Sequence, residues 1–246
     1  MFSGFYTIAS GMMNNQKELN VAANNLANVR TNGYRSKRLI KGTFDETFVR
    51  QMNGQNTAIG GGSTINLAVG ERSSHKQGEV DDTGKTYDLA IVGDGYFVIQ
   101  GEAGTYLTRN GHFSTDDEGN LILPGVGTVM GDGGPVYVDE GGFRVDRSGI
   151  VYDEEGGELD QVQIVMPDDV NNLILNENGT YSVEDAGTLA QVYPEVLQGK
   201  LERSGVDLNS EVSRTMEIQR AFQSCAKALT IMDQMNQKTA SDIGKI

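Results

Sequence analysis

The first thirty residues carry apolar side chains at a helical spacing. Apolar residues recur every three or four positions, with Asn15 as the one polar member of the stripe. This heptad-like period predicts a helix that buries one narrow stripe against a partner helix. Asn32-Gly33 follows the stripe and favours a terminating turn. The apolar members are Phe5, Ile8, Met12, Leu19, Ala22, Leu26 and Val29.

A second stripe of the same kind lies near the C-terminus. Its members are Ile218, Phe222, Cys225, Leu229 and Met232. Asp207 or Asn209 can cap the helix, and Glu211 stands near the positive end of its dipole. The pattern predicts one long helix from Leu208 to about Ile243.

Two interpretations of the stripes are open. The ends could form an intramolecular helical hairpin that covers a sheet, or they could pair with each other and with neighbouring copies. We favour assembly because both stripes are narrow and rich in alanine, which suits close helix packing. Polar Asn24, Asn25 and Asn28 beside the first stripe favour a specified register over raw stability.

The middle of the chain has a β pattern. Leu89–Val92 and Tyr96–Ile99 are short apolar runs separated by a turn at Gly93-Asp94-Gly95. Asn110-Gly111 favours a type I′ hairpin, and Asn178-Gly179 repeats that signal. Turns about every ten residues predict a small barrel or sandwich of hairpins. The expected fold class is α+β, with paired terminal helices and a central all-β domain.

Charge divides the chain in the same way as the pattern. The formal net charge of −14 is made up of +4 over residues 1–70, −18 over residues 71–200 and zero over residues 201–246. We therefore expect an N-terminal helix and turn (1–35), a connecting segment (36–70), an acidic, glycine-rich β domain (71–200) and a C-terminal helix (201–246).

Composition excludes several classes of function. An acidic chain lacks the basic face that nucleic acid requires, and no run approaches the ~18–20 apolar residues of a membrane-spanning helix. The N-terminus shows no ordinary secretory signal. The two histidines, His75 and His112, have no nucleophile motif near them, and the acidic runs lack the spacing of a calcium loop. We expect neither catalysis nor a cofactor or metal.

Three blocks of residues resemble the family of bacterial flagellar rod and hook proteins. The first block is Tyr6–Met12 with Ala23–Val29 and Thr31–Arg35. The second block is Gln77-Gly78 with Asp88–Phe97 and Thr108–Gly111, and the third is Leu197–Glu202 with Gln219–Phe222. The three blocks occur in the family's order and cover nearly the whole chain.

The resemblance implies a structural subunit of the flagellar rod. Its terminal helices would assemble into a helical drive shaft, and the β domain would form an outer layer. It also implies homo-oligomerisation, contact with other rod and hook proteins, and export without a cleaved signal through the flagellar type III apparatus to the basal body. The long insertion typical of hook proteins is missing, which argues against hook protein itself. The segment Phe44–Leu67 is shorter than the loop of the distal-rod type, so the resemblance favours the proximal-rod type, with the distal-rod type next. A secreted β-rich binding or adhesin module with oligomerising helical ends is the alternative from another class.

The residues expected to carry this role fall into three groups. The N-terminal assembly group is Ile8, Met12, Leu19, Ala22, Asn24, Asn25, Leu26, Asn28, Gly33 and Tyr34. The C-terminal assembly group is Gly199, Leu201, Glu202, Ile218, Arg220, Phe222, Leu229 and Met232. The β-domain turns are Gly93, Gly95, Asn110 and Gly111.

Overall fold

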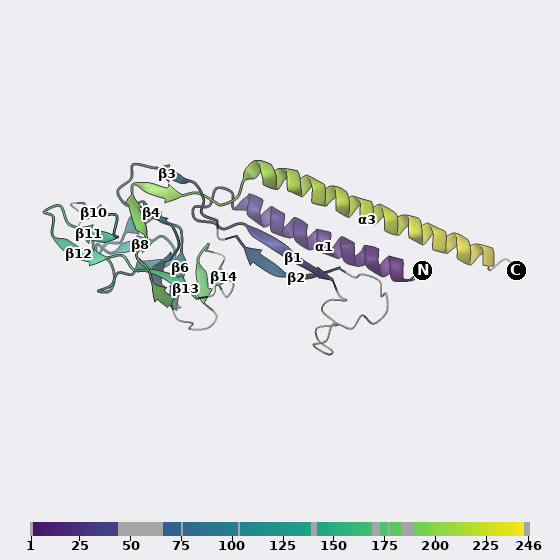
Figure 1. Ribbon diagram of the computed structural model, residues 1–246, viewed down its shortest axis with the longest axis horizontal. Coiled ribbons are helices and arrows are strands. Elements are labelled where there is room, and N and C mark those ends of the chain that lie inside the picture. The colour runs from purple at the N-terminus through teal and green to yellow at the C-terminus, as the bar shows by residue number, and fades with distance from the viewer. Residues whose placement is uncertain are drawn as a thin grey trace. The chain divides into compact units, whose positions relative to one another are not determined.

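The computed structural model describes residues 2–43, 66–74, 76–102, 104–138, 142–168, 173–176, 178–183 and 189–243 (Figure 1). The chain forms two compact units. A helical unit comprises Met1–Ala27, Lys37–Ser74 and Asp207–Ile246, and a β unit comprises Asn28–Ser36 and His75–Val206. The short connection after the first helix therefore belongs to the β unit.

The helical unit contains two antiparallel helices, α1 (Phe2–Ala27) and α3 (Leu208–Ile243), which lie side by side in Figure 1. The side chain of Asn25, near the end of α1, contacts Glu211 at the start of α3. The predicted span of the second helix is confirmed, and Asp207 caps it by accepting a hydrogen bond from the backbone N–H of Asn209 at 3.1 Å.

A two-stranded hairpin, β1 (Lys37–Thr43) and β2 (Asn66–Ser73), completes the helical unit. Its strands are antiparallel, with a bulge between Ile40 and Lys41. The side chain of Asn25 holds the hairpin to α1: its amide donates to Lys37 O at 2.8 Å and its oxygen accepts from Lys37 N at 2.9 Å. Strand β1 and the first part of β2 lie in the segment 36–70, which was expected only to connect the domains, and β2 continues three residues beyond it. Residues 44–65 of that segment lie outside the described residues.

The β unit consists of short strands in several open sheets, so the α+β class is confirmed and a closed barrel is not formed. The largest sheet has the order β14-β15-β6-β5-β9-β8-β7, with β13 pairing both β5 and β16. Smaller sheets are β10-β11-β12, β17-β4 and β18-β3. The bounds are β3 Val80–Asp82, β4 Leu89–Val92, β5 Tyr96–Gly101, β6 Gly104–Thr108, β7 Ser114–Thr115, β8 Leu121–Leu123, β9 Gly127–Val129, β10 Arg144–Val145, β11 Ile150–Tyr152, β12 Glu158–Gln161, β13 Ile164–Pro167, β14 Leu173–Leu175, β15 Tyr181–Val183, β16 Leu189–Gln191, β17 Glu195–Gln198 and β18 Lys200–Glu202.

Strand β5 lies at the centre of the core because both of its faces are buried. Phe97 and Ile99 belong to a large cluster that also contains residues of β4, β8, β9, β11 and β13. Tyr96 and Val98 point into a smaller cluster with Leu107. An uninterrupted apolar run is what a strand buried on both faces requires.

Two of the predicted turns differ in what they do. Asn178-Gly179 lies in the connection of the β14–β15 hairpin, so the predicted hairpin is confirmed. The turn is not of type I′, because Gly179 has a positive φ and Asn178 does not. Asn110-Gly111 does not form a type I′ hairpin, because β6 pairs with β5 and β15, and β7 pairs with β8. Gly111 instead passes against the backbone of Leu89, whose N–H donates to Gly111 O at 3.0 Å. A side chain at Gly111 would overlap Leu89 O.

Gly111→Ala therefore should destabilise the β unit by about 1–3 kcal/mol, because the Leu89 backbone must move to admit a methyl group. The measurement is urea unfolding followed by near-UV circular dichroism of tyrosine, since Tyr6 is the one tyrosine of the helical unit. Gly133→Ala is the matched control, because the nearest atoms to its added carbon lie 3.5 Å away. Equal stability of the two variants would contradict the close approach at Gly111.

Candidate functional site

The two helices leave an apolar groove along their contact. The groove has a volume of about 440 Å³ and is lined by Ala9, Met12, Met13, Gln16 and Lys17 of α1 and by Phe222 and Leu229 of α3. Beside it, Asn15 Nδ2 lies 3.8 Å from Cys225 Sγ. The predicted polar member of the first stripe therefore contacts Cys225, a member of the second stripe.

Large apolar side chains also stand exposed on the same unit. Met13 is 64% exposed on α1, and Met216 and Met235 on α3 are 54% and 63% exposed. Tyr6, near the start of α1, is 61% exposed. Apolar side chains that gather on one surface of a soluble protein mark an interaction site.

The predicted assembly residues occupy three kinds of environment. Those fully buried are Ala22, Asn25, Gly33, Tyr34, Leu201, Glu202 and Ile218, and those half-buried are Ile8, Met12, Leu19, Leu26, Asn28, Gly199, Phe222, Leu229 and Met232. Asn24 and Arg220 are exposed on the helices. Of the turn residues, Gly95 and Gly111 are buried, Asn110 is half-buried and Gly93 is exposed. A stripe that is mostly half-buried leaves room for further packing.

A polar network across the helical unit was not predicted. Glu18 of α1, with 8% of its surface exposed, accepts a hydrogen bond from Arg214 Nη2 of α3 at 2.7 Å and pairs with Lys41 of β1. Asn25 donates to Glu211 Oε1 at 2.9 Å. A second period, Asn14-Glu18-Val21-Asn25, marks this buried face of α1, and it is visible in the sequence once polar positions are counted with apolar ones.

The charge environment lowers the pKa of Glu18. Burial alone would raise that pKa, but hydrogen bonds from Arg214 and Lys41 and their positive charges outweigh it. A carboxyl whose pKa is lower in the folded state stabilises that state above its ordinary pKa, and this contribution is lost as the pH falls through the lowered value. Protonation of Glu18 at low pH therefore lowers the stability of the helical unit.

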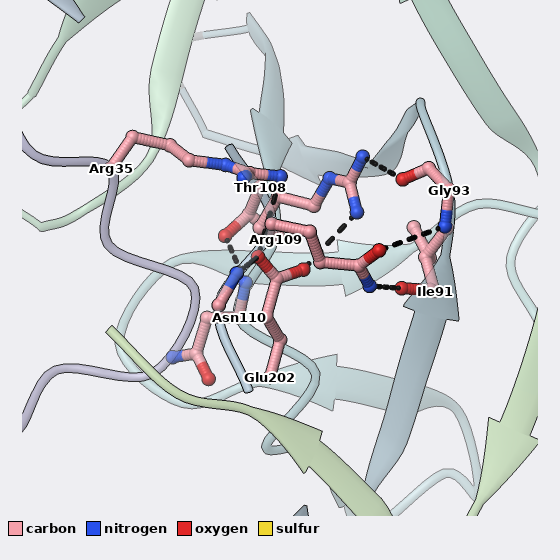
Figure 2. A network of polar contacts seen from close by, with 9 residues as sticks. Arg35, Ile91, Gly93, Thr108, Arg109, Asn110 and Glu202 are labelled. Atoms are coloured by element: carbon pink, nitrogen blue, oxygen red, sulfur yellow. Dashed lines mark hydrogen bonds and ion pairs between the residues drawn. The ribbon is translucent and has the colours of Figure 1, made fainter. Parts of the chain in front are cut away.

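Residues from four separate segments meet at a buried charge cluster in the β unit (Figure 2). Arg35 Nη2 lies 3.3 Å from Glu202 Oε1, and Arg109 Nη1 lies 3.1 Å from Glu202 Oε2. Gly78 N donates to Glu202 Oε1 at 3.1 Å. Gln77 lies beside the cluster, where its side chain donates to Ile91 O at 2.6 Å and accepts from Gly93 N.

The cluster places two guanidinium groups around one carboxylate, all nearly without solvent. Arg35 and Arg109 are each 3% exposed and Glu202 is 2% exposed. Arg109 also donates to Gly93 O at 2.6 Å and lies over the ring of Tyr96, 5.4 Å from its centroid. Burial lowers the pKa of Arg109, and the charge of Glu202 opposes that shift. Glu202 therefore supplies the negative charge that offsets the buried guanidinium groups.

Backbone contacts fix the connection after α1 to the same cluster. Gly33 N donates to Glu202 O at 2.8 Å, and Gly205 N donates to Tyr34 O at 2.8 Å. Gly33 has φ of 68°, and a side chain there would come within 2.7 Å of Arg109 O. Glycine is thus required by both conformation and space. The three sequence blocks that define the resemblance converge on Glu202.

No metal or catalytic arrangement stands out in the part of the chain that the structure describes. No group of three or more His, Cys, Asp and Glu side chains there is placed to hold a metal ion. His112 Nδ1 lies 2.7 Å from Asp88 Oδ1, and Thr83 Oγ1 donates to Asp88 Oδ2 at 2.6 Å. His75 lies outside the described residues. Within the described helices, none has the length and apolar character to cross a membrane.

Comparison with known proteins gives three matching families. Residues 5–35 match the family "Flagella basal body rod protein", residues 90–127 match "Flagellar hook protein FlgE/F/G D1 domain", and residues 197–242 match "Flagellar basal body rod FlgEFG protein C-terminal". The first of these regions contains Arg35, the second Arg109 and the third Glu202.

The chain is also similar to named relatives over its whole length. It is 31% identical to flagellar basal-body rod protein FlgF of Caulobacter vibrioides over 255 aligned positions, covering 100% of both chains. It is 32% identical to flagellar basal-body rod protein FlgG of Bacillus subtilis over 266 positions, covering 97% of this chain and 98% of the relative. Flagellar hook protein FlgE of Treponema pallidum is 31% identical over 135 positions, which are 52% of this chain and 28% of the relative.

Glu202→Gln should destabilise the β unit by about 3–5 kcal/mol, because it leaves two buried guanidinium groups without a counter-charge. The measurement is urea unfolding followed by near-UV tyrosine signal. Glu195→Gln is the matched control: Glu195 pairs with Arg147 in an exposed bridge, and its loss should cost less than about 1 kcal/mol. Similar losses in the two variants would contradict the role of Glu202 as the central counter-charge.

Glu18→Gln should make the stability of the helical unit less dependent on pH in the acid range. In the unmodified chain, helix stability should fall as the pH drops below the ordinary pKa of glutamate and through the lowered pKa of Glu18, because Glu18 must take up a proton against Arg214 and Lys41. The variant should be less stable than the unmodified chain at neutral pH, and its stability should fall less as the pH is lowered. The measurement is far-UV thermal unfolding in a pH series, with exposed Glu217→Gln as the control. An unchanged pH slope in Glu18→Gln would show that Glu18 does not carry the effect.

Proposed function

Because the chain belongs to the family of flagellar basal-body rod proteins, we propose that it is a structural subunit of the flagellar rod, located in the basal body. Its relatives are named as structural parts of the flagellum, and the proposed role involves no catalysis. The work of such a subunit is done by surfaces that bind other subunits.

The observation that carries this proposal is the small core of the helical unit. Among the described residues, Val21, Ala22 and Ile218 are its buried hydrophobic side chains, whereas the β unit holds all the others. Helices of 26 and 36 residues with so little buried apolar surface gain most of their stability from packing against further partners. Neighbouring subunits in a rod would supply that packing.

The geometry suits an open assembly rather than a closed ring. Antiparallel α1 and α3 present an apolar groove, which Met13 helps to line, and α3 carries further exposed methionines at Met216 and Met235. The unit thus offers more than one apolar surface to its neighbours. A heterologous contact repeated without closure generates a helical filament. Many small packing contacts between long helices give such a filament stiffness against shear.

The buried charge cluster provides a firm anchor for the chain where it enters and leaves the β unit. Arg35 lies between α1 and β1. Glu202 lies five residues before Asp207, the residue that caps the start of α3. Glu202 pairs with both Arg35 and Arg109, so the two passages meet at its carboxylate. Torque carried by the helices would thus reach the β unit through this buried charge cluster, which holds the two chain passages in place.

Among the positions in the rod, we favour the proximal one. The segment 44–67 is shorter than the loop that the family resemblance leads us to expect in a distal-rod subunit, and this difference supports the proximal type. A distal-rod subunit is the alternative, and basal bodies from a deletion strain distinguish the two by where the rod stops.

The proposal includes contact with copies of the same chain, with other rod and hook proteins and with the type III export apparatus. A subunit that passes unfolded through a narrow channel cannot be locked by a disulfide, and the chain has a single cysteine, Cys225. The helical unit has a small core, so we expect it to unfold easily for export and to gain its full stability from its neighbours.

Phe222→Asp should abolish swimming while export of the subunit continues, because a carboxylate in the groove opposes helix packing between subunits. The measurement is soft-agar motility, with immunoblots of cells and medium and electron microscopy of basal bodies. Phe222→Leu, which keeps the groove apolar, is the matched control and should swim. Normal motility of Phe222→Asp, or of a strain that lacks the chain, would contradict the proposed role.

A further inference from the structure

The hairpin of the helical unit holds two arginines directly opposite each other. Arg38 of β1 is paired in register with Arg72 of β2, so their side chains leave the hairpin on the same face. Both residues are exposed. Like charges at directly opposed positions destabilise a sheet, and folding of the hairpin gains nothing from this pair.

The opposite face of the hairpin shows how its other cations are neutralised. Lys37 lies 3.7 Å from Glu71, and Lys41 pairs with Glu18 of α1. Neither Arg38 nor Arg72 forms an ion pair with a carboxylate among the described residues. The chain therefore presents two adjacent guanidinium groups that need an anion from elsewhere.

Apolar side chains stand next to the arginine pair. Ile40, two residues after Arg38 on the same face, is 43% exposed, and Val69 is 65% exposed. A surface that combines two unneutralised arginines with exposed aliphatic side chains has the composition of a protein interface, where arginine and apolar residues are enriched. We call Arg38, Ile40, Val69 and Arg72 the basic hairpin face.

We propose that the basic hairpin face docks onto the acidic β unit of a second copy of this chain. This inference rests on the proposed rod function and adds to it an electrostatic contact outside the helix stripes. Charge complementarity selects the occupant: residues 71–200 carry a net charge of −18, whereas residues 1–70 carry +4. Arginine pairs with carboxylates through two parallel hydrogen bonds, which fix orientation as well as add attraction.

The β11–β12 hairpin is the acidic surface that matches best. Its exposed carboxylates are those of Glu154, Glu155 and Glu158, and Leu159 beside them is 40% exposed. Acidic and apolar side chains thus stand together, as basic and apolar ones do on the basic hairpin face. The turn at Asp116 is a poorer match, because the Asp116 carboxylate already accepts hydrogen bonds from Glu118 N and from the backbone and side chain of Asn120.

The test uses the full-length chain and its self-association in low salt, measured by sedimentation velocity. Arg38→Glu with Arg72→Glu should weaken association at least about tenfold, and raising the salt concentration should weaken the unmodified chain in the same direction. A second variant reverses Glu154, Glu155 and Glu158 to arginine and should fail equally when alone. Both sets of reversals combined in one chain should restore association, because the two exchanged surfaces are again opposite in charge.

Controls separate this contact from a general attraction between oppositely charged surfaces. Asp117→Arg with Glu118→Arg reverses a different exposed acidic turn. When it is added to the Arg38/Arg72 reversal in the same chain, it should not restore association. Far-UV spectra of all variants should match that of the unmodified chain, since every changed side chain is exposed. Strains carrying the Arg38/Arg72 reversal should lose motility, and adding the reversal of Glu154, Glu155 and Glu158 should restore part of it.

Several outcomes would overturn the inference. They are unchanged association of the Arg38/Arg72 variant, equal restoration by the Asp117/Glu118 control, absence of association by the unmodified chain in low salt, or an effect confined to binding of phosphatidylglycerol vesicles. If Phe222→Asp abolishes motility and the Arg38/Arg72 variant swims normally, the rod function stands and the docking contact fails. If neither change affects motility, the rod function fails.

Discussion

The carboxylate of Glu202, buried between Arg35 and Arg109, is the interaction on which the organisation of this chain depends. Two guanidinium groups without solvent are tolerated only because one carboxylate offsets part of their charge and accepts a further hydrogen bond from Gly78. The cluster joins a residue that follows α1, a residue that follows β6 and a residue that precedes α3. Because Arg35 is held by Glu202, the connection Asn28–Ser36 packs with the β unit rather than with the helices.

The two units solve the problem of stability in opposite ways. The β unit buries an apolar core on both faces of β5 and needs no partner. The helical unit buries few apolar side chains and relies on polar contacts, in which Glu18 and Asn25 join α1 to α3 and to β1. Polar contacts specify register but add little net stability. The helical unit is thus correctly arranged before assembly and firmly stable only within it.

The sequence predicts local features of this structure far better than long-range ones. The period of apolar residues is a local signal, and it predicted the span of α3 correctly. Glu202 was singled out by its sequence block, but its pairing with Arg35 and Arg109 joins residues far apart in the chain, and no local pattern encodes that. The strands β1 and β2 were missed because charged residues and a bulge break their alternation. At Gly111 the residue type was informative, yet the cause was a close approach of Leu89 rather than a turn.

The distribution of charge follows from the same difference between a helical unit that packs against neighbours and a β unit that is stable through its own core. Helices that pack against copies of themselves must carry little net charge, because like charges brought together without solvent repel strongly. The acidic residues are accordingly concentrated in the β unit, which is stable by its own core and can remain hydrated. In the described hairpin, Lys37 and Lys41 pair with carboxylates, whereas Arg38 and Arg72 form no ion pair among the described residues. An uncompensated pair next to an acidic neighbour costs the monomer little and favours contact between copies.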